Sequence, residues 1–527
     1  MLVVDDEDLA LMSLVAMLED VAHTAPPADT GRQALALLNG GGHADLVITD
    51  QATPKMTGAQ LAEAIKAEWP TLPIILATGC AEPGPGLAAD LTRLARPFSQ
   101  ADLAKAVGDA IAKRSSRPEA RLGRASRAWF SKQSAPAAGP GRRQGDQAMA
   151  DGSVSGFTDN KFAAVADTFQ ANLDSGDDVG ASFCATVDGE TVVDLWGGWA
   201  DEAKTRPWEK DTIINVYSTT KTMTALTALL LADRGELDFD APVANYWPEF
   251  AANGKAGVKV SHLMSHSAGL SGWKETITRE DVYDWDKVTS LLAAQAPFWE
   301  PGTAPGYHAL TQGYLVGEVV RRITGRSLGT VFREEIAEPL GADFHIGLAP
   351  EHDTRVADLI PPPPGGSIGD GEQSELTRNM SSNPGIHVGD TRTRAWRAAE
   401  IPAAGGHGNA RSVAQIHMIL ANGGVAKGKR FMSEAGCRKA LELQVEGTDL
   451  ILGQPARFGL GFGLPGATLP LPNPNSMFWG GYGGSLIIID MDARTTFGYA
   501  MNKMAPTTTG DMRAFGLAVA MWNGLSA

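Results

Sequence analysis

The sequence predicts an α/β chain with two domains: an N-terminal doubly wound parallel sheet, and a C-terminal antiparallel sheet flanked by helices with an inserted helical region. Three observations support this fold class. A chain of 527 residues is longer than one ordinary domain. Short apolar segments alternate with helical patterns over residues 1–112, which is typical of βαβ units. Strand patterns occur at both ends of residues 156–527, with helices between them, which indicates one antiparallel sheet built from both ends.

The first domain contains short apolar segments that predict buried strands. These segments are residues 2–4, 46–49 and 74–77, and helical patterns cover 9–18 and 59–69. Such strands run parallel, so we expect a ligand site at the edge of the sheet formed by their carboxyl ends.

Residues 113–155 differ in composition from the sequence on either side. Arg, Ser, Pro, Ala and Gly dominate, and residues 114–118 read Arg-Ser-Ser-Arg-Pro. Such a stretch buries little apolar surface, so we expect a flexible linker between the two domains.

The second domain has a predicted hairpin near each end. Its elements are a helix at 160–173, strands at 181–187 and 191–196, strands at 486–489 and 495–501, and a helix at 512–522. Asp188-Gly189 separates the first pair of strands and is a strong hairpin signal. Residues 490–494 connect the second pair.

The composition excludes several classes of function. A net charge of −16 repels nucleic-acid phosphates and anionic lipid surfaces, so no nucleic-acid or membrane partner is expected. The three cysteines, Cys80, Cys184 and Cys437, lie far apart and predict neither a disulfide framework nor a zinc site. No basic segment precedes an apolar one at the N-terminus, and no apolar stretch reaches membrane-spanning length, so a cytoplasmic protein is expected.

Ser218 and Lys221 form a Ser-x-x-Lys motif at the start of a predicted helix. The helix extends to about Arg234, with Gly235 as its C-cap. Residues three positions apart share one helix face. A serine hydroxyl is a weak nucleophile until a base removes its proton, and a lysine whose pKa is lowered by burial can do this. The helix N-terminus also offers a backbone N–H to a developing oxyanion.

Two downstream motifs give this pair its context. Residues 307–309 read Tyr-His-Ala, and residues 479–484 read Trp-Gly-Gly-Tyr-Gly-Gly directly before the last two strands. With these motifs, residues 156–527 resemble the serine esterases of the class C β-lactamase and penicillin-binding-protein superfamily, called family VIII carboxylesterases.

The resemblance implies a β-lactamase/transpeptidase-like fold with Ser218, Lys221 and Tyr307 as catalytic residues. Ser218 would form the acyl-enzyme. Lys221 would share a proton network with Tyr307, whose phenol or phenolate would act as general acid and base. The backbone N–H groups of Ser218 and Tyr482 would form the oxyanion hole. No cofactor is expected for this domain.

The site departs from the β-lactamase pattern in two places. Trp479 stands where those enzymes have the lysine of Lys-Thr-Gly, and Ala309 where they have the asparagine of Tyr-x-Asn. Both changes remove polar contacts to a β-lactam, and Trp479 fits a neutral acyl or alcohol group. Gly480 and Gly481 would let the substrate approach the strand closely. These departures favour a carboxylesterase for small or short-chain esters, with weak hydrolysis of some β-lactams as an alternative.

Ser327 lies in a second serine motif. Residues 325–329 match the Gly-x-Ser-x-Gly pattern, which requires a strand before the serine. Residues 312–323 predict a helix instead, so we interpret Gly325 as its C-cap and Ser327 as the N-cap of the next helix.

Three histidines, His262, His266 and His308, suggest a Ser-His-Asp triad as another mechanism. The resembled family needs no histidine, so this triad ranks below the lysine mechanism. We interpret His266 as stabilising the loop at residues 267–269.

Polar residues follow the predicted strands of the first domain. Asp5 and Asp6 follow the first strand, Asp50 ends the segment 45–50, and Thr78 follows the segment 74–77. With these residues, the region 1–112 resembles the receiver domain of response regulators. The resemblance implies a Mg²⁺ site at the three aspartates, a phosphoryl group on Asp50, Thr78 as the hydroxyl that senses it, and a histidine kinase or other phosphodonor as partner.

Two departures from the receiver pattern concern its switch. Arg96, before Pro97-Phe98, stands where the family has a lysine, and a planar guanidinium is not equivalent to an ammonium. No aromatic switch residue is evident near Arg93. The domain is therefore either a signalling receiver or a folded receiver that no longer signals.

Three functions follow from these observations. The first is a serine carboxylesterase that carries a receiver and acts on a small-molecule ester. The second is a signalling protein in which phosphorylation of Asp50 gates the hydrolase. The third is a non-catalytic binding module on a penicillin-recognising fold. The set of Ser218, Lys221 and Tyr307 counts against the third function, and the long linker counts against the second.

Overall fold

The chain forms two compact units in the computed structural model, Met1–Ala148 and Met149–Ala527, and each is described by itself. The structure describes residues 1–5, 14, 27–28, 30–39, 44–50, 56–78, 91–95, 103, 105–107, 110, 153–362, 374–466 and 469–526. The predicted helix at 9–18, apart from Leu14, and the predicted linker, apart from its last three residues, lie outside the described residues.

The first unit contains a five-stranded parallel sheet with the order β2-β1-β3-β4-β5. Its strands are β1 (Leu2–Val4), β2 (Pro27–Ala28), β3 (Val47–Asp50), β4 (Ile74–Thr78) and β5 (Thr92–Ala95), and its fully described helices are α2 (Gly31–Asn39) and α3 (Gly58–Glu68). Val3 and Ile48 pack in one apolar cluster, and Leu2 and Val47 pack in another. Because alternate residues of a strand face opposite sides, both faces of the sheet are covered, as the sequence predicts.

The second unit contains a six-stranded antiparallel sheet with the order β16-β17-β18-β7-β8-β6. In chain order the strands are β6 (Ser155–Thr158), β7 (Gly180–Val187), β8 (Glu190–Gly198), β16 (Ser476–Gly480), β17 (Leu486–Asp490) and β18 (Thr495–Met501). β18 pairs with β7 along its whole length, which joins the last strands to the first and confirms the predicted sheet. Ser155, expected at the end of the linker, begins an edge strand instead.

The predicted hairpin turn at Asp188-Gly189 is present between β7 and β8. Asp188 has a φ of 49° and Gly189 a φ of 85°. Positive φ at both central residues is the conformation of a type I′ turn, whose twist matches that of the two strands.

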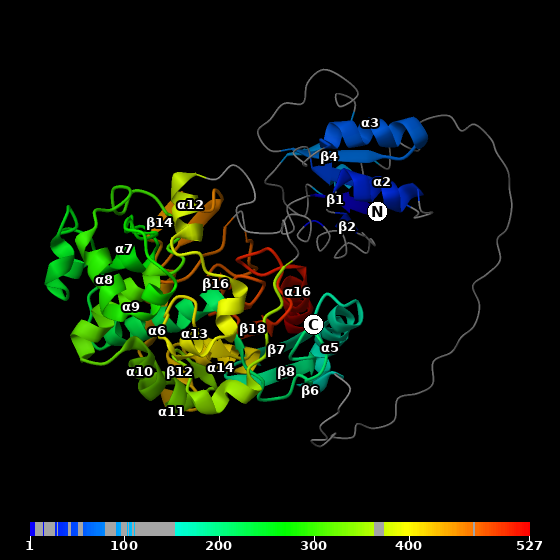
Figure 1. The fold of residues 1–527 in the computed structure, drawn as a ribbon. Helices are drawn as coiled ribbons and strands as arrows, with labels where there is room; N and C mark the ends of the chain where they lie inside the picture. The colour runs from blue at the N-terminus through cyan, green and yellow to red at the C-terminus, as the bar shows by residue number, and fades with distance from the viewer. Residues whose placement is uncertain are drawn as a thin grey trace, which may run out of the picture. The chain divides into compact units, whose positions relative to one another are not determined.

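Helices cover both faces of this sheet (Figure 1). α14 (Ala410–Ala421) packs on one face, where Ala410 and Ala414 contact Cys184 of β7. α5 (Ala163–Asp174) and α16 (Met512–Ser526) pack against each other on the opposite face, and the Trp522 ring of α16 lies 5.5 Å from that of Phe497.

The region between the two halves of the sheet is rich in helices, which loops and short strands connect, as predicted. Its helices other than α14 are α6 (Thr220–Asp233), α7 (Val260–Met264), α8 (Trp285–Ala294), α9 (Thr311–Thr324), α10 (Leu328–Phe332), α11 (Glu338–Leu340), α12 (Glu375–Ser382), α13 (Arg394–Ala398) and α15 (Glu434–Arg438). Its short strands are β9 (Ile214–Asn215), β10 (Phe344–His345), β11 (His407–Gly408), β12 (Val425–Ala426), β13 (Lys429–Arg430), β14 (Val445–Thr448) and β15 (Pro455–Phe458).

None of the helices in the described part of the chain combines the length and the apolar character that crossing a bilayer requires.

Candidate active site

Ser218 lies in a single 3₁₀ turn, Tyr217–Thr219, between β9 and α6. Tyr217 has a φ of 42°, a conformation that costs energy for a residue with a side chain. Two contacts hold it there: its N–H donates to the Asn215 side chain at 3.2 Å, and its ring packs edge-on against Tyr482 at 5.6 Å. The serine therefore projects from a turn that the surrounding structure fixes.

Lys221 lies one turn along the chain and is completely buried. Its Nζ is 3.1 Å from the Ser218 Oγ, 2.7 Å from the Ala309 carbonyl oxygen and 3.0 Å from the Ala403 carbonyl oxygen. Burial lowers the pKa of Lys221 well below its usual value. A neutral amine has two N–H bonds and one lone pair. When the two carbonyls accept these two N–H bonds, the lone pair is the part of the amine left for the Ser218 hydroxyl, whereas the ammonium form donates to Ser218 Oγ.

Tyr307 contacts the same serine oxygen from another segment. Its hydroxyl donates to the Ser218 Oγ at 2.6 Å, and its ring centroid lies 4.9 Å from the Lys221 Nζ. Burial raises the pKa of Tyr307, the hydrogen bond to Ser218 opposes this, and the Asp449 carboxylate adds to the increase. The phenol therefore keeps its proton at neutral pH and can donate it. Ser218 Oγ is thus hydrogen bonded to both the Lys221 amine and the Tyr307 phenol, the two groups of the expected proton network.

The glycine-rich segment after β16 lies beside the nucleophile turn. β16 ends at Gly480, and a Cβ on the next residue, Gly481, would lie 2.2 Å from the Val216 carbonyl oxygen. Ser485 Oγ donates to that same carbonyl at 2.9 Å. Tyr482 follows directly, and its role as the second oxyanion donor stays a prediction.

Trp479 forms an aromatic wall beside Tyr307. The Trp479 ring is stacked on His266 at 5.3 Å with an interplanar angle of 15°, and lies 6.2 Å from Tyr307 and 5.6 Å from Phe458. All four rings are buried or half-buried. This side of the site is therefore aromatic. The Trp479 side chain is uncharged, so it cannot form an ion pair with a substrate carboxylate.

The histidines have other partners. His308 Nε2 accepts from the Leu270 N–H at 3.0 Å, and its Nδ1 lies 2.6 Å from a backbone carbonyl. Burial lowers the pKa of His308 to about 3. His266 Nδ1 accepts from the His308 N–H, so the His266 side chain holds the segment next to Tyr307. Its stabilisation of the loop at residues 267–269 stays a prediction. His262 accepts from the Lys259 N–H. Within the described residues, none of the three is hydrogen bonded to the nucleophile.

Ser327 has a structural role, as the sequence predicts. α9 ends before Gly325, whose φ is 70°, and Ser327 is the N-cap of α10, where its Oγ accepts from the Thr330 N–H. The same hydroxyl donates to Glu400 at 2.6 Å. The Ser327 hydroxyl is thus engaged in capping α10 and in binding Glu400.

Sequence reasoning missed two groups that hold the site. Asp449 Oδ1 accepts from the Tyr307 N–H at 3.1 Å, from the Ile451 N–H at 2.8 Å and from the Leu452 N–H at 2.9 Å. The Ala403 carbonyl binds the catalytic amine. A lone aspartate in a loop and a backbone carbonyl leave no pattern in a sequence, so only the fold could identify them.

The receiver residues fall partly within the described structure. β1 pairs with β3 through Val4 and Thr49, so Asp5 and Asp50 continue this register at the carboxyl ends of adjacent strands, and both are buried. Thr78 ends the neighbouring strand β4. The side chain of Thr78, and all of Asp6 and Arg96, lie outside the described residues.

Two carboxylates at adjacent strand ends have the hard oxygen donors that Mg²⁺ prefers. Asp5 and Asp50 therefore fit part of the expected Mg²⁺ site. Among the residues whose placement is described, no three His, Cys, Asp or Glu side chains are grouped to hold a metal ion.

Family models match both parts of the chain. Residues 165–520 match the model described as Beta-lactamase, and residues 1–106 match the response regulator receiver domain. Both resemblances drawn from the motifs are thereby confirmed.

Individual esterases and a penicillin-binding protein homologue are similar to the second unit. Esterase/beta-lactamase LipL of Mycobacterium tuberculosis is 35% identical over 377 residues, which are 69% of this chain and 86% of that protein. The crystal structure of a family VIII carboxylesterase is 44% identical with a TM-score of 0.68, and covers 71% of this chain and 100% of its own. A penicillin-binding protein homologue from Caulobacter crescentus is 37% identical with a TM-score of 0.66, with coverage of 71% and 100%.

Proposed function

Residues 165–520 belong to the beta-lactamase family and the chain is a serine hydrolase, and from this premise we propose that it is a carboxylesterase that hydrolyses small or short-chain esters through an acyl-enzyme on Ser218. One observation carries the proposal. The Ser218 Oγ lies between the Lys221 Nζ at 3.1 Å and the Tyr307 hydroxyl at 2.6 Å. A base and an acid are therefore each within hydrogen-bonding distance of the nucleophile.

In acylation, the neutral Lys221 amine takes the Ser218 proton as Oγ attacks the ester carbonyl carbon. The negative charge that develops on the carbonyl oxygen is stabilised by the backbone N–H groups of Ser218 and Tyr482. The ester C–O bond then breaks, and the leaving alkoxide takes the proton of the Tyr307 phenol. The Lys221 ammonium returns a proton to the phenolate, which restores both groups.

In deacylation, a water molecule attacks the acyl carbon and transfers a proton to the same amine and phenol pair. The bond between the acyl carbon and Ser218 Oγ breaks, and Oγ regains its proton. The sum of the two steps is the conversion of ester and water to acid and alcohol. No cofactor takes part in this proposal.

The wall formed by Trp479, His266 and Phe458 supports the preference for esters. Apolar rings favour a neutral acyl or alcohol group, because a carboxylate placed against them would lose its hydration without gaining a partner. Ala309 contributes only its backbone carbonyl to the site, which binds Lys221. A β-lactam that carries a carboxylate therefore has fewer partners here than an uncharged ester.

A substrate panel tests the proposal. We expect the purified chain to hydrolyse p-nitrophenyl acetate and butyrate with a kcat/KM well above that for the chromogenic β-lactam nitrocefin. The similarity to a protein named as both esterase and beta-lactamase supports β-lactam hydrolysis as the second candidate function. Nitrocefin turnover above ester turnover would favour that candidate, and no turnover of either substrate would contradict both.

For the first unit, we propose a receiver that accepts a phosphoryl group from a phosphodonor at Asp50. Asp5, Asp6 and Asp50 would hold Mg²⁺, which neutralises charge on the phosphoryl oxygens, and Thr78 and Arg96 would respond to the modification. The position of Asp5 and Asp50 at adjacent strand ends supports this proposal.

A further inference from the structure

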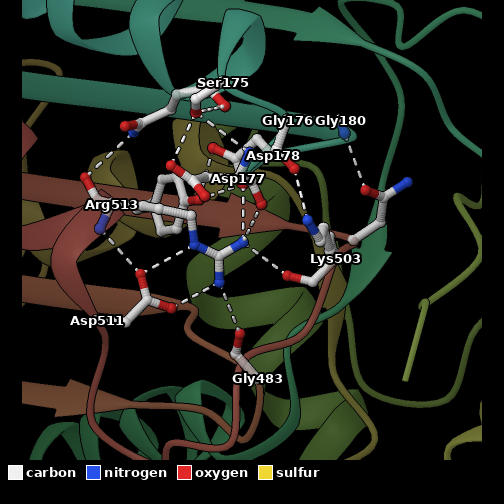
Figure 2. A network of polar contacts seen from close by, with 12 residues as sticks. Ser175, Gly176, Asp177, Asp178, Gly180, Gly483, Lys503, Asp511 and Arg513 are labelled. Carbon is white, nitrogen blue, oxygen red and sulfur yellow. Dashed lines mark hydrogen bonds and ion pairs between the residues drawn. The ribbon is translucent and has the colours of Figure 1, made fainter. Parts of the chain in front are cut away.

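A buried ionic network lies behind the glycine-rich segment that follows β16 (Figure 2). It consists of Arg513 at the start of α16, Asp511 just before that helix, and Asp178 before β7. Arg513 is 7% exposed, Asp511 8% and Asp178 2%. The Tyr499 hydroxyl also donates to Asp178, at 2.7 Å. None of these residues belongs to the proposed catalytic set.

Arg513 uses its whole guanidinium group in this network. Nε and Nη2 bind the two oxygens of Asp511 at 2.9 and 2.6 Å. Nη1 binds Asp178 at 2.9 Å and the Lys503 carbonyl at 2.7 Å. Nη2 also donates to the Gly483 carbonyl at 3.1 Å. The planar fork of an arginine thus connects three separate chain segments, and one of them is the segment beside Ser218.

Gly483 lies in a tight turn whose other central residue is Tyr482. The Gly484 N–H donates to the Gly481 carbonyl at 3.1 Å, which closes a four-residue turn over residues 481–484. Gly483 has a φ of 101°, which suits the third position of a type II turn. Tyr482 occupies the second position of this turn. The direction of its backbone N–H therefore depends on how both ends of the turn are held.

Both ends of the turn are held by side chains. On the nucleophile side, Ser485 Oγ binds the Val216 carbonyl at 2.9 Å. On the opposite side, Arg513 binds the carbonyl of Gly483 at 3.1 Å. The same carbonyl accepts from the Ala505 N–H at 2.9 Å, and the Gly483 N–H donates to the Thr507 carbonyl at 2.9 Å. A Cβ on Gly484 would lie 2.8 Å from the Arg513 Nη2, so the backbone packs directly against the guanidinium.

Stability alone does not account for this network. Burying an arginine with two carboxylates costs desolvation energy, and well-packed apolar side chains often serve a fold equally well. An oxyanion donor, in contrast, is effective only when its position is held to within about 0.5 Å.

We propose that Arg513 is a positioning residue for the oxyanion hole: its bond to the Gly483 carbonyl, added to the backbone bonds with Ala505 and Thr507, fixes the turn that presents the Tyr482 N–H to the substrate. Asp511 and Asp178 orient the guanidinium for this contact. The inference rests on the proposed function, because it assigns Tyr482 to the oxyanion hole of the esterase.

The test compares two arginine-to-lysine variants of the full chain, Arg513→Lys and Arg411→Lys. Arg411 is a matched control, because its Nε binds Asp194 of β8 at 2.6 Å and the pair is mostly buried. Its Nη1 donates to the Lys210 carbonyl, in the segment before β9. The measurements are kcat and KM for p-nitrophenyl butyrate, the Ki of phenylboronic acid, which forms a tetrahedral adduct on a reactive serine, and the melting temperature.

An ammonium cannot span Asp511, Asp178 and Gly483 at once. We therefore expect Arg513→Lys to lower kcat by about 10²-fold. KM should change little, and the Ki of the boronic acid should rise with the fall in kcat, because both report on the tetrahedral oxygen. Arg411→Lys should lower the melting temperature and leave kcat and Ki at wild-type values.

Wild-type kcat and Ki in folded Arg513→Lys would overturn the inference, as would equal losses in both variants. If Arg513→Lys fails to fold, Asp511→Asn replaces it: this isosteric change disturbs one side of the guanidinium, and an unchanged kcat there would also overturn the inference. Failure of the proposed function is distinguishable, because it would be seen as absent ester turnover in the unmutated chain, and it would overturn both proposals together.

Discussion

The Tyr307 hydroxyl lies 2.6 Å from the Ser218 Oγ, although 89 positions separate the two residues in the sequence. Lys221 Nζ contacts the same oxygen at 3.1 Å. The serine hydroxyl is therefore the point at which an amine and a phenol meet, and the proposed chemistry requires both groups.

The two serine motifs of the chain give the first prediction. Ser218→Ala should remove measurable ester turnover, because the attacking oxygen is lost. Ser327→Ala should leave kcat nearly unchanged and lower stability by about 1 kcal/mol, the usual cost of losing a helix N-cap. The p-nitrophenyl butyrate assay and thermal melting measure the two effects. Turnover in Ser218→Ala with loss of activity in Ser327→Ala would reverse the assignment.

The second prediction concerns the pH dependence of the rate. Burial lowers the pKa of Lys221, so the amine is neutral at pH values above that lowered pKa and can accept the serine proton. The rate should rise as pH increases through this pKa and fall as the amine is protonated at lower pH. Lys221→Ala should cost about 10²–10⁴-fold in kcat and lose this limb of the kcat/KM profile. An acid limb that persists in Lys221→Ala would assign it to another group.

Tyr307 gives the third prediction. Tyr307→Phe keeps the ring in the aromatic wall but removes the proton donor, so kcat should fall by about 10²–10⁴-fold. Tyr314→Phe is the matched control: its hydroxyl is also buried but donates to the Val282 carbonyl at 2.6 Å, away from the serine. That variant should lose stability and keep its kcat. Equal kcat losses in both variants would indicate a general packing effect.

Asp449 gives a prediction about stability. Asp449→Ala leaves the N–H groups of Tyr307, Ile451 and Leu452 without their shared acceptor. Leaving a buried donor unsatisfied costs about 1–3 kcal/mol, so the free energy of unfolding of this unit should fall by at least that amount. kcat should fall as well, because the segment that carries Tyr307 loosens. Urea titration followed by tryptophan fluorescence measures the first effect, and an unchanged midpoint would contradict it.

The receiver gives the fifth prediction. We expect acetyl phosphate to leave the ester turnover of the full chain unchanged, because a composition like that of residues 113–155 transmits little between domains. Asp50→Ala should behave in the same way. A rate change in the wild type that is absent from Asp50→Ala would instead support a hydrolase gated by phosphorylation.

The sequence by itself determined the fold class and most of the candidate site. Local signals were sufficient for the elements: Asp188-Gly189 for a type I′ hairpin, and Gly325 and Ser327 for the end of one helix and the start of the next. Ser218 and Lys221 are three positions apart, so helical periodicity alone places them on one face. The motifs at residues 307–309 and 479–484 then identified the family.

Only the tertiary structure decided which groups hold the proposed catalytic residues in place. Ala403 binds the lysine, Asp449 binds the backbone of Tyr307, and Arg513 binds the carbonyl of Gly483. These contacts join positions that are distant in the sequence, and each of the three uses a backbone atom whose direction depends on the local fold. Local propensity sets which elements form, whereas the packing of one element against another sets where a carbonyl or a guanidinium is directed, so this information exists only in the folded chain.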